Sequence, residues 1–173
     1  YGGPKDWEGK GIHVQGLSYW APANIGPYSQ SRLSYGVNYM AGQIGLVASS
    51  LKLFEEGEED QCRLALQNAL RIARTVHGDN NWTILTAVVY IVNPSTREFV
   101  EKLWPFDLPL VVAQVATLPR NAACEWDLST VDLRYIEGHP PEDDELDERY
   151  FYRPVHLTVE GGYVCHYGNQ RSS

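Results

Sequence analysis

The sequence predicts an α+β fold in which two helices cover one face of a mixed β-sheet. Three observations lead to this class: an amphipathic helical segment follows a predicted β-hairpin, a continuous apolar run follows that helix, and a second helical segment separates the run from two further strands. This order is typical of an α+β sandwich. Because two helices can cover only one face of such a sheet, we expect self-association to bury the other face.

The first elements are predicted to be strands and a loop. Residues 12–19 have a strand-like apolar composition, and residues 21–30 form a loop punctuated by glycine and proline. Residues 33–46 predict two strands joined around residues 34–36. This hairpin follows from the alternation of Val37, Tyr39 and Ala41 with Asn38 and Met40.

The clearest element is an amphipathic helix that follows the acidic residues 55–60. These acids stand where a helix carries the positive end of its dipole. Gly78 is positioned to end the helix. Apolar side chains recur at three- and four-residue steps and therefore share one face: Cys62, Leu66, Ala69, Leu70, Ala73 and Val76.

A strand and a second helix are expected next. Residues 84–92 form a continuous apolar, β-branched run, which predicts a strand buried on both faces. Residues 96–104 predict a shorter helix with Phe99, Val100 and Leu103 turned toward the core.

The final core elements are two strands separated by a turn. Residues 110–118 predict another buried strand, residues 119–121 the turn, and residues 122–133 the last strand of the sheet.

Composition divides the chain into four segments. We expect an N-terminal extension at 1–11, one folded domain at 12–135, an acidic linker at 136–150 and a C-terminal β-hairpin extension at 151–173. The linker is rich in carboxylates, and the last segment alternates apolar residues around a Gly-Gly turn. Since the chain does not begin with Met, we expect it to be a fragment or a processed product.

Charge and composition exclude several classes of partner. The 22 acidic residues exceed the 14 basic ones, which gives a formal net charge of −8. Without a basic stripe, nucleic acid is not expected to bind. The apolar runs are far shorter than the roughly 20 residues of a membrane span, so no membrane partner is expected.

Cysteine and histidine spacing indicates neither a metal nor a cofactor site. The 3 cysteines are widely spaced without a Cys-x-x-Cys pair, and the 5 histidines lack the spacing of metal ligands. Reduced thiols in the cytoplasm fit this pattern. Phosphate-binding and dinucleotide-binding motifs are absent from the sequence, so no cofactor is expected.

Four motifs in a fixed order carry a resemblance to a known family. Residues 25–30 read IGPYSQ and residues 41–45 read AGQIG; farther along, residues 114–119 read QVATLP and residues 124–127 read CEWD. The stretch from 14 to 133 resembles the RidA/YjgF family, also called L-PSP endoribonucleases. The resemblance implies a chorismate-mutase-like fold that closes into a homotrimer, with ligands bound in clefts between subunits.

A narrower resemblance involves residues 18–24 (SYWAPAN), which lead into IGPYSQ, and residues 39–43 (YMAGQ). Together they look like the C-terminal RidA-like domain of eukaryotic diphthine–ammonia ligases. That resemblance implies a multidomain parent enzyme that amidates diphthine on elongation factor 2 in diphthamide biosynthesis. The other domains of the ligase would then be partners, and its ATP-dependent chemistry would lie outside this chain.

The family resemblance also assigns site residues. Tyr28 matches the loop tyrosine that walls the cleft, and Glu125 matches the glutamate that orients the hydrolytic water. Deaminating members hold the substrate carboxylate with an arginine four residues before the QVA segment, where this sequence has Leu110. Their serine before Gly-Gln is replaced by alanine. The predicted ligand cleft comprises Tyr28, Ala41, Gly42, Leu110, Arg120 and Glu125.

Each candidate also has a structural interpretation. Glu125 is either a general acid/base or a strand carboxylate paired at a subunit interface, and the missing arginine favours the second. Tyr28 either walls the cleft or packs as an aromatic with its hydroxyl bonded to backbone. Arg120 either reaches into the cleft or lies on the surface, which is favoured. Cys124 is expected to be a small buried apolar side chain.

Three functions remain in competition. The leading hypothesis is a non-catalytic or altered-specificity domain that binds ligand and oligomerises within a diphthine–ammonia ligase. The alternative is an enamine or imine deaminase that releases ammonia, for which Glu125 is the candidate catalytic residue. An endoribonuclease is the third, and the acidic charge argues against it.

Overall fold

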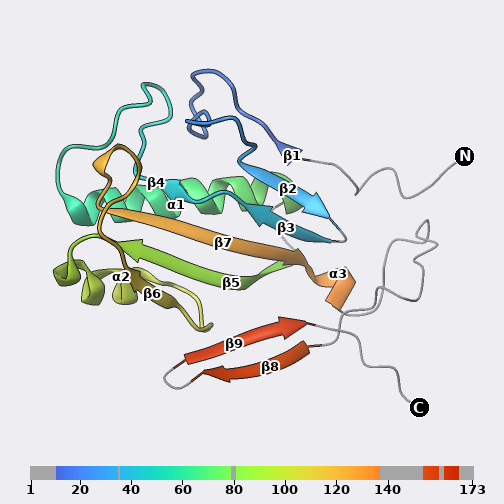
Figure 1. Cartoon of the computed structure of the whole chain (residues 1–173). Coiled ribbons are helices and arrows are strands. Elements are labelled where there is room, and N and C mark those ends of the chain that lie inside the picture. Colours follow the sequence, from blue (N-terminus) through green and yellow to red (C-terminus); the bar gives the residue numbers. More distant parts are fainter. Residues whose placement is uncertain (1–10, 35, 79–80, 137–153, 160–161, 168–173) are drawn as a thin grey trace, which may run out of the picture.

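One mixed sheet organises the described part of the chain in the computed structural model (Figure 1). The structure describes residues 11–34, 36–78 and 81–136, together with the backbone of two strands at 154–159 and 162–167. The sheet order is β1-β2-β3-β7-β5-β6, with β4 also paired to β7. The pair β5–β6 is parallel and the other pairs are antiparallel, which confirms the α+β class and the mixed sheet.

The elements follow the predicted order along the chain. The sheet strands are β1 (Gly11–Ile12), β2 (Ser31–Ser34), β3 (Val37–Met40), β4 (Gln43–Ile44), β5 (Trp82–Ile91), β6 (Val111–Gln114) and β7 (Cys124–Asp132). The helices are α1 (Glu58–His77), α2 (Arg97–Leu103) and the short α3 (Leu133–Ile136), with 3-10 turns at Pro94–Thr96 and Pro119–Asn121.

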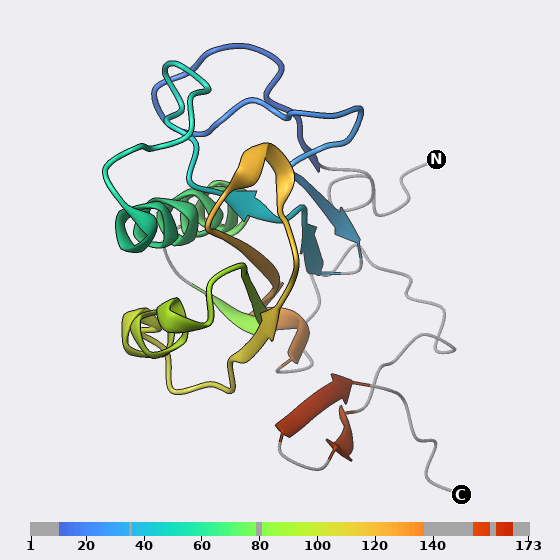
Figure 2. The same ribbon diagram turned by 60° about the vertical axis from the view of Figure 1, so that its left-hand side comes forward.

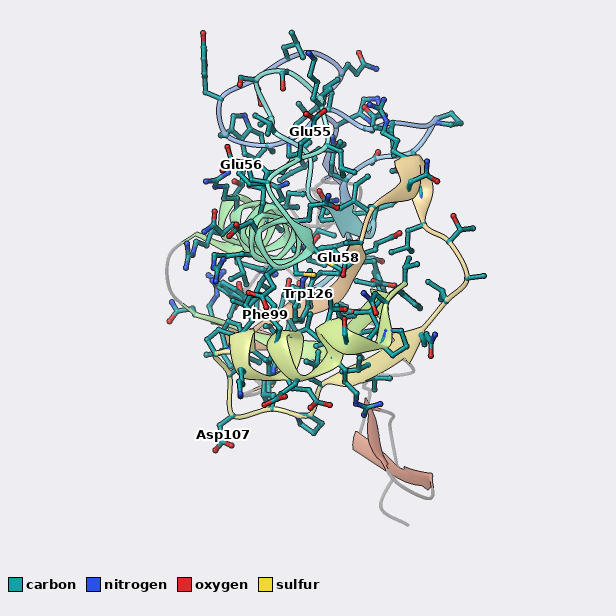
Figure 3. The ribbon with its side chains drawn as sticks, turned by 90° about the vertical axis from the view of Figure 1, so that its left-hand side faces the viewer. Glu55, Glu56, Glu58, Phe99, Asp107 and Trp126 are labelled. Atoms are coloured by element: carbon teal, nitrogen blue, oxygen red, sulfur yellow. The ribbon has the colours of Figure 1, made fainter. Side chains whose placement is uncertain are left out.

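Helices α1 and α2 cover the same face of the sheet, and the main core lies beneath them (Figure 2). The predicted apolar face of α1 is buried, and the helix ends where Gly78, at φ 82°, bonds its N–H to the carbonyl of Arg74. In α2, Val100 is fully buried and Phe99 is partly buried. Figure 3 shows Phe99 and Trp126 in the layer between the two helices.

The prediction of a strand over residues 12–19 is wrong for most of its length, since β1 contains only Gly11–Ile12. The Gln30 side chain, and not a neighbouring strand, bonds the backbone of this segment at Val14. The Gln30 Oε1 atom accepts the Val14 N–H at 2.8 Å, and Gln30 Nε2 donates to the Val14 carbonyl at 3.1 Å. The backbone of this segment is therefore satisfied without a β-ladder.

The prediction that β5 and β6 are buried on both faces is also wrong for a single chain. Along β5 the side chains that face the helices are buried, whereas Val88 and Tyr90 on the other side are only half-buried. Val111 of the edge strand β6 is 44% exposed. The registers place the following residues together on this second face: Tyr39, Thr86, Val88, Tyr90, Val111, Glu125, Asp127 and Ser129.

The predicted C-terminal hairpin corresponds to strands β8 (Pro154–Val159) and β9 (Gly162–Tyr167), which pair antiparallel. The turn between them lies outside the described residues, as do the N-terminal extension apart from Gly11 and the acidic linker apart from Ile136. The division into four segments therefore stays a prediction. Among the helices that the structure does describe, none combines the length and apolarity that crossing a bilayer requires.

Candidate functional site

A hollow forms where the loop that precedes β2 meets β4, the turn at Pro119 and the start of β7. It encloses about 40 Å³. This is well below the roughly 300–1,000 Å³ that ligand pockets usually reach. The hollow is lined by Pro22, Ala23, Asn24, Ile25, Tyr28, Gln30, Gly42, Gln43, Ile44, Leu46, Pro119 and Glu125.

The loop that carries Tyr28 is held by two amide side chains. The buried Gln30 side chain donates to the carbonyl of Pro22 at 3.0 Å as well as bonding Val14. Asn24 Nδ2 donates to the carbonyls of Gly26 and Tyr28 at 2.8 and 2.7 Å. These bonds fix the loop that brings Tyr28 to the rim of the hollow, where its side chain is 43% exposed.

At two glycines of the hollow, a Cβ atom would displace a neighbouring side chain. A Cβ atom at Gly26 would lie 2.6 Å from the Tyr28 ring, so the ring rests against bare backbone. A Cβ atom at Gly42 would lie 1.8 Å from Glu125 Oε1. The Glu125 carboxylate therefore lies over the Gly42 backbone, which is the physical reason for glycine in the AGQIG motif.

Burial keeps two acids of β7, Glu125 and Asp127, more readily protonated than exposed carboxyls. Burial, followed by the charge of Asp127, raises the pKa of Glu125, and burial raises the pKa of Asp127. Burial and the Glu125 charge also raise the pKa of Tyr28, against a hydrogen bond with the Ile25 backbone. Among the described residues, no ion pair engages Glu125 or Asp127. A carboxyl in this environment can exchange a proton near neutral pH more easily than an exposed one.

The structure brings together three of the six residues predicted for the cleft: Tyr28, Gly42 and Glu125. Ala41 adjoins them in sequence, and its N–H donates to the Gln30 carbonyl at 2.8 Å. Whether all six form one ligand cleft stays a prediction.

Leu110 and Arg120 do not line the hollow within one chain. Leu110 packs against the main core cluster. Arg120 is exposed at φ 56°, and its Nη1 donates to the carbonyl of Leu51 at 2.8 Å. Arg120 thus takes the surface position that was the favoured interpretation.

Sequence reasoning missed Asn24, Gln30 and Gln43 as determinants of the hollow. Asn24 and Gln30 border or end the IGPYSQ segment, and Gln43 follows Gly42, so the motif itself carried the signal. Gln43 Nε2 donates to the carbonyl of Ala41 at 2.9 Å, which holds the backbone beneath Glu125. Across the described ranges, no group of three or more histidine, cysteine or acidic side chains is arranged to hold a metal ion. Cys124 is fully buried in the core, as predicted.

Comparisons with known proteins define the class. Residues 19–130 match the family model described as "Endoribonuclease L-PSP". RidA from the Antarctic bacterium Psychrobacter sp. PAMC 21119 superposes with a TM-score of 0.59 at 23% identity, over 66% of this chain and 95% of that one. E. coli TdcF with bound serine gives a TM-score of 0.58 at 22% identity, over 70% and 98% of the two chains. The chain belongs to the endoribonuclease L-PSP (RidA) family.

Curated relatives narrow the comparison. A diphthine–ammonia ligase of Schizosaccharomyces pombe is 40% identical over 128 residues, which are 70% of this chain and 21% of the ligase. The Saccharomyces cerevisiae ligase is 30% identical over 87% of this chain and 26% of its own length. A mouse 2-iminobutanoate/2-iminopropanoate deaminase is 33% identical over 68% of this chain and 90% of the deaminase. The chain thus spans about a quarter of the ligase relatives or less.

Proposed function

We propose that this chain is a RidA-like domain of a diphthine–ammonia ligase that self-associates in the cytoplasm and binds a ligand other than the 2-imino acids of the deaminases. One observation carries the proposal: the hollow keeps Tyr28 and Glu125 but has no cationic side chain among its lining residues. The identity of up to 40% with ligases over most of this chain supports the choice of parent protein.

Loss of the carboxylate anchor makes 2-imino acids poor ligands. An arginine–carboxylate fork contributes about 2–4 kcal/mol, and a leucine at its position contributes none of this. Glu125 weakens the binding of 2-imino acids further, because its ionised form repels a substrate carboxylate in the same hollow. Chemistry that depends on positioning such a carboxylate is therefore not expected here.

The assay of 2-iminobutanoate hydrolysis tests this proposal. We expect the purified chain to accelerate the reaction no more than buffer does, while a deaminase relative of the mouse type accelerates it strongly. The raised pKa of Glu125 favours a second candidate function, imine hydrolysis with Glu125 as general acid/base. A rate above buffer that disappears in Glu125→Gln would establish that second function and refute the first.

Self-association is the other half of the proposal. The second face of the sheet carries Tyr39 and Val111, which are 58% and 44% exposed, beside half-buried Val88. Glu125 lies on this same face and lines the hollow, so a partner that covers the face also closes the hollow.

Solution mass measurement at micromolar concentration tests the assembly. We expect the mass of three chains for the unmodified protein and a shift toward monomer in Val111→Glu, because a buried charge opposes burial of this face. Gln67→Glu, which adds the same charge on the exposed surface of α1, is the control and should remain a trimer. A monomeric unmodified chain contradicts the proposal.

A further inference from the structure

The charges around the hollow are of one sign. Glu125 is the charged side chain of its lining, and Asp127 lies two residues along β7 on the same face. Among the described residues, the ion pairs engage other acids: Asp60, Glu98, Glu101 and Asp132. Arg120, next to the lining residue Pro119, directs Nη1 to the Leu51 carbonyl. A half-buried carboxylate thus faces the hollow without an ion-pair partner within the described part of the chain.

We propose that the hollow binds a small protonated amine that carries no carboxylate. This inference rests on the proposed function, since it specifies the ligand class of the same cleft. It reverses the charge preference of a deaminase site, which requires a cation in the protein and an anion in the ligand.

Three features of the lining fit an alkylammonium group. Glu125 can accept a charge-assisted hydrogen bond from the ammonium N–H. Tyr28, at the rim, offers a hydroxyl acceptor and an aromatic ring, whose face attracts cations. Apolar side chains complete the wall and suit a short alkyl chain: Pro22, Ile25, Ile44, Leu46 and Pro119.

The Glu125 environment also predicts how binding depends on pH. A bound cation favours the ionised carboxylate, whereas burial and the Asp127 charge raise the pKa of Glu125, so amine binding and protonation of Glu125 oppose each other. Affinity is therefore expected to fall as the pH is lowered through the raised pKa of Glu125. A neutral ligand of the same size would not show this dependence.

Three small probes that share a three-carbon chain and differ in charge test the inference on the full chain. Backbone amide NMR of Gly42, Gln43 and Glu125 is followed during titration with n-propylammonium, propanamide and propionate. We expect saturable shifts with n-propylammonium at about millimolar affinity, because ligands of a few heavy atoms gain at most roughly 1.5 kcal/mol per atom. Propionate should give none.

Two variants and one control test whether the Glu125 carboxylate itself binds the amine. Glu125→Gln should weaken n-propylammonium binding about tenfold or more, since a charge-assisted bond becomes a neutral one. Gly42→Ala should weaken it too, because a Cβ there would displace the carboxylate. Glu55→Gln removes the same charge from an exposed residue outside the lining and should leave binding unchanged.

The outcomes distinguish this inference from the proposed function. Equal binding of propionate, unchanged amine binding in Glu125→Gln, or no saturable shift with n-propylammonium would overturn the amine assignment. Binding of propanamide alone would also overturn it while leaving the proposed function intact. Hydrolysis of 2-iminobutanoate by the unmodified chain would instead refute the proposed function.

Discussion

Replacing Trp126 with alanine is expected to lower the free energy of unfolding by about 3–5 kcal/mol, the usual range for an aromatic core deletion. Trp126 is fully buried on β7, and its ring stacks on Trp104 with centroids 5.6 Å apart. Its Nε1 donates to the Cys62 carbonyl of α1 at 3.0 Å. One side chain therefore joins the sheet to both the first helix and the segment after the second helix.

Chemical denaturation at fixed protein concentration measures this effect. Trp126→Phe is the matched control, because it keeps an aromatic ring and loses the indole hydrogen bond, a net contribution of about 1 kcal/mol. We expect its loss of stability to be well below that of Trp126→Ala. Similar losses for the two variants would mean that the hydrogen bond, rather than ring packing, stabilises the junction of β7 and α1.

The sequence predicted those elements whose signals are local. The periodic apolar positions, the acidic first turn and Gly78 defined α1 closely, because a helix bonds within its own segment. The segment at 12–19 failed for the opposite reason. The backbone of Val14 in this segment is hydrogen-bonded by the side chain of Gln30, which is 16 residues away. No local pattern encodes that pairing.

Burial of the strands could not be predicted from composition alone. The run at 84–92 is apolar throughout, yet Val88 and Tyr90 face away from the helices and stay half-buried in one chain. Apolar side chains are expected on a strand wherever it is buried, whether its own chain or a second chain covers it. The apolar composition of this strand and the incomplete burial of Val88 and Tyr90 together argue for self-association, whereas neither observation does so alone.

The residues of the candidate site also differ in how well the sequence predicted them. Tyr28, Gly42 and Glu125 lie in the short motifs that carry the family resemblance, and pairing of β4 with β7 brings the AGQIG and CEWD motifs together. Leu110 was assigned by counting back from Gln114, and Arg120 by its place in the turn that follows. Neither argument shows which way a side chain faces. The structure places Leu110 against the core and Arg120 against Leu51.

Asp132→Asn is expected to destabilise the protein by about 1–3 kcal/mol at pH 7, the contribution of hydrogen bonds to a charged group. Its carboxylate is nearly fully buried and accepts bonds from Arg134 Nε at 2.9 Å and Nη2 at 2.5 Å. Burial raises the pKa of Asp132, but the hydrogen bonds and charge of Arg134 outweigh it, so the pKa is lowered overall. This stabilisation is present above the unfolded pKa of about 3.9 and is lost as the pH falls through the lower folded pKa.

Asp127, on the same strand, has a raised pKa where that of Asp132 is lowered. The two substitutions are therefore expected to change stability in different ways as the pH changes. The raised pKa of Asp127 means that the folded state binds a proton more tightly than the unfolded chain, so its charge opposes folding as the pH rises through the folded pKa. Unfolding of both variants should be followed from pH 3 to pH 8. Asp132→Asn should lose its effect toward pH 3, while Asp127→Asn should be neutral or stabilising at pH 7. Equal destabilisation by the two substitutions at pH 7 would show that strand packing, and not the Arg134 contact, determines what each carboxylate contributes.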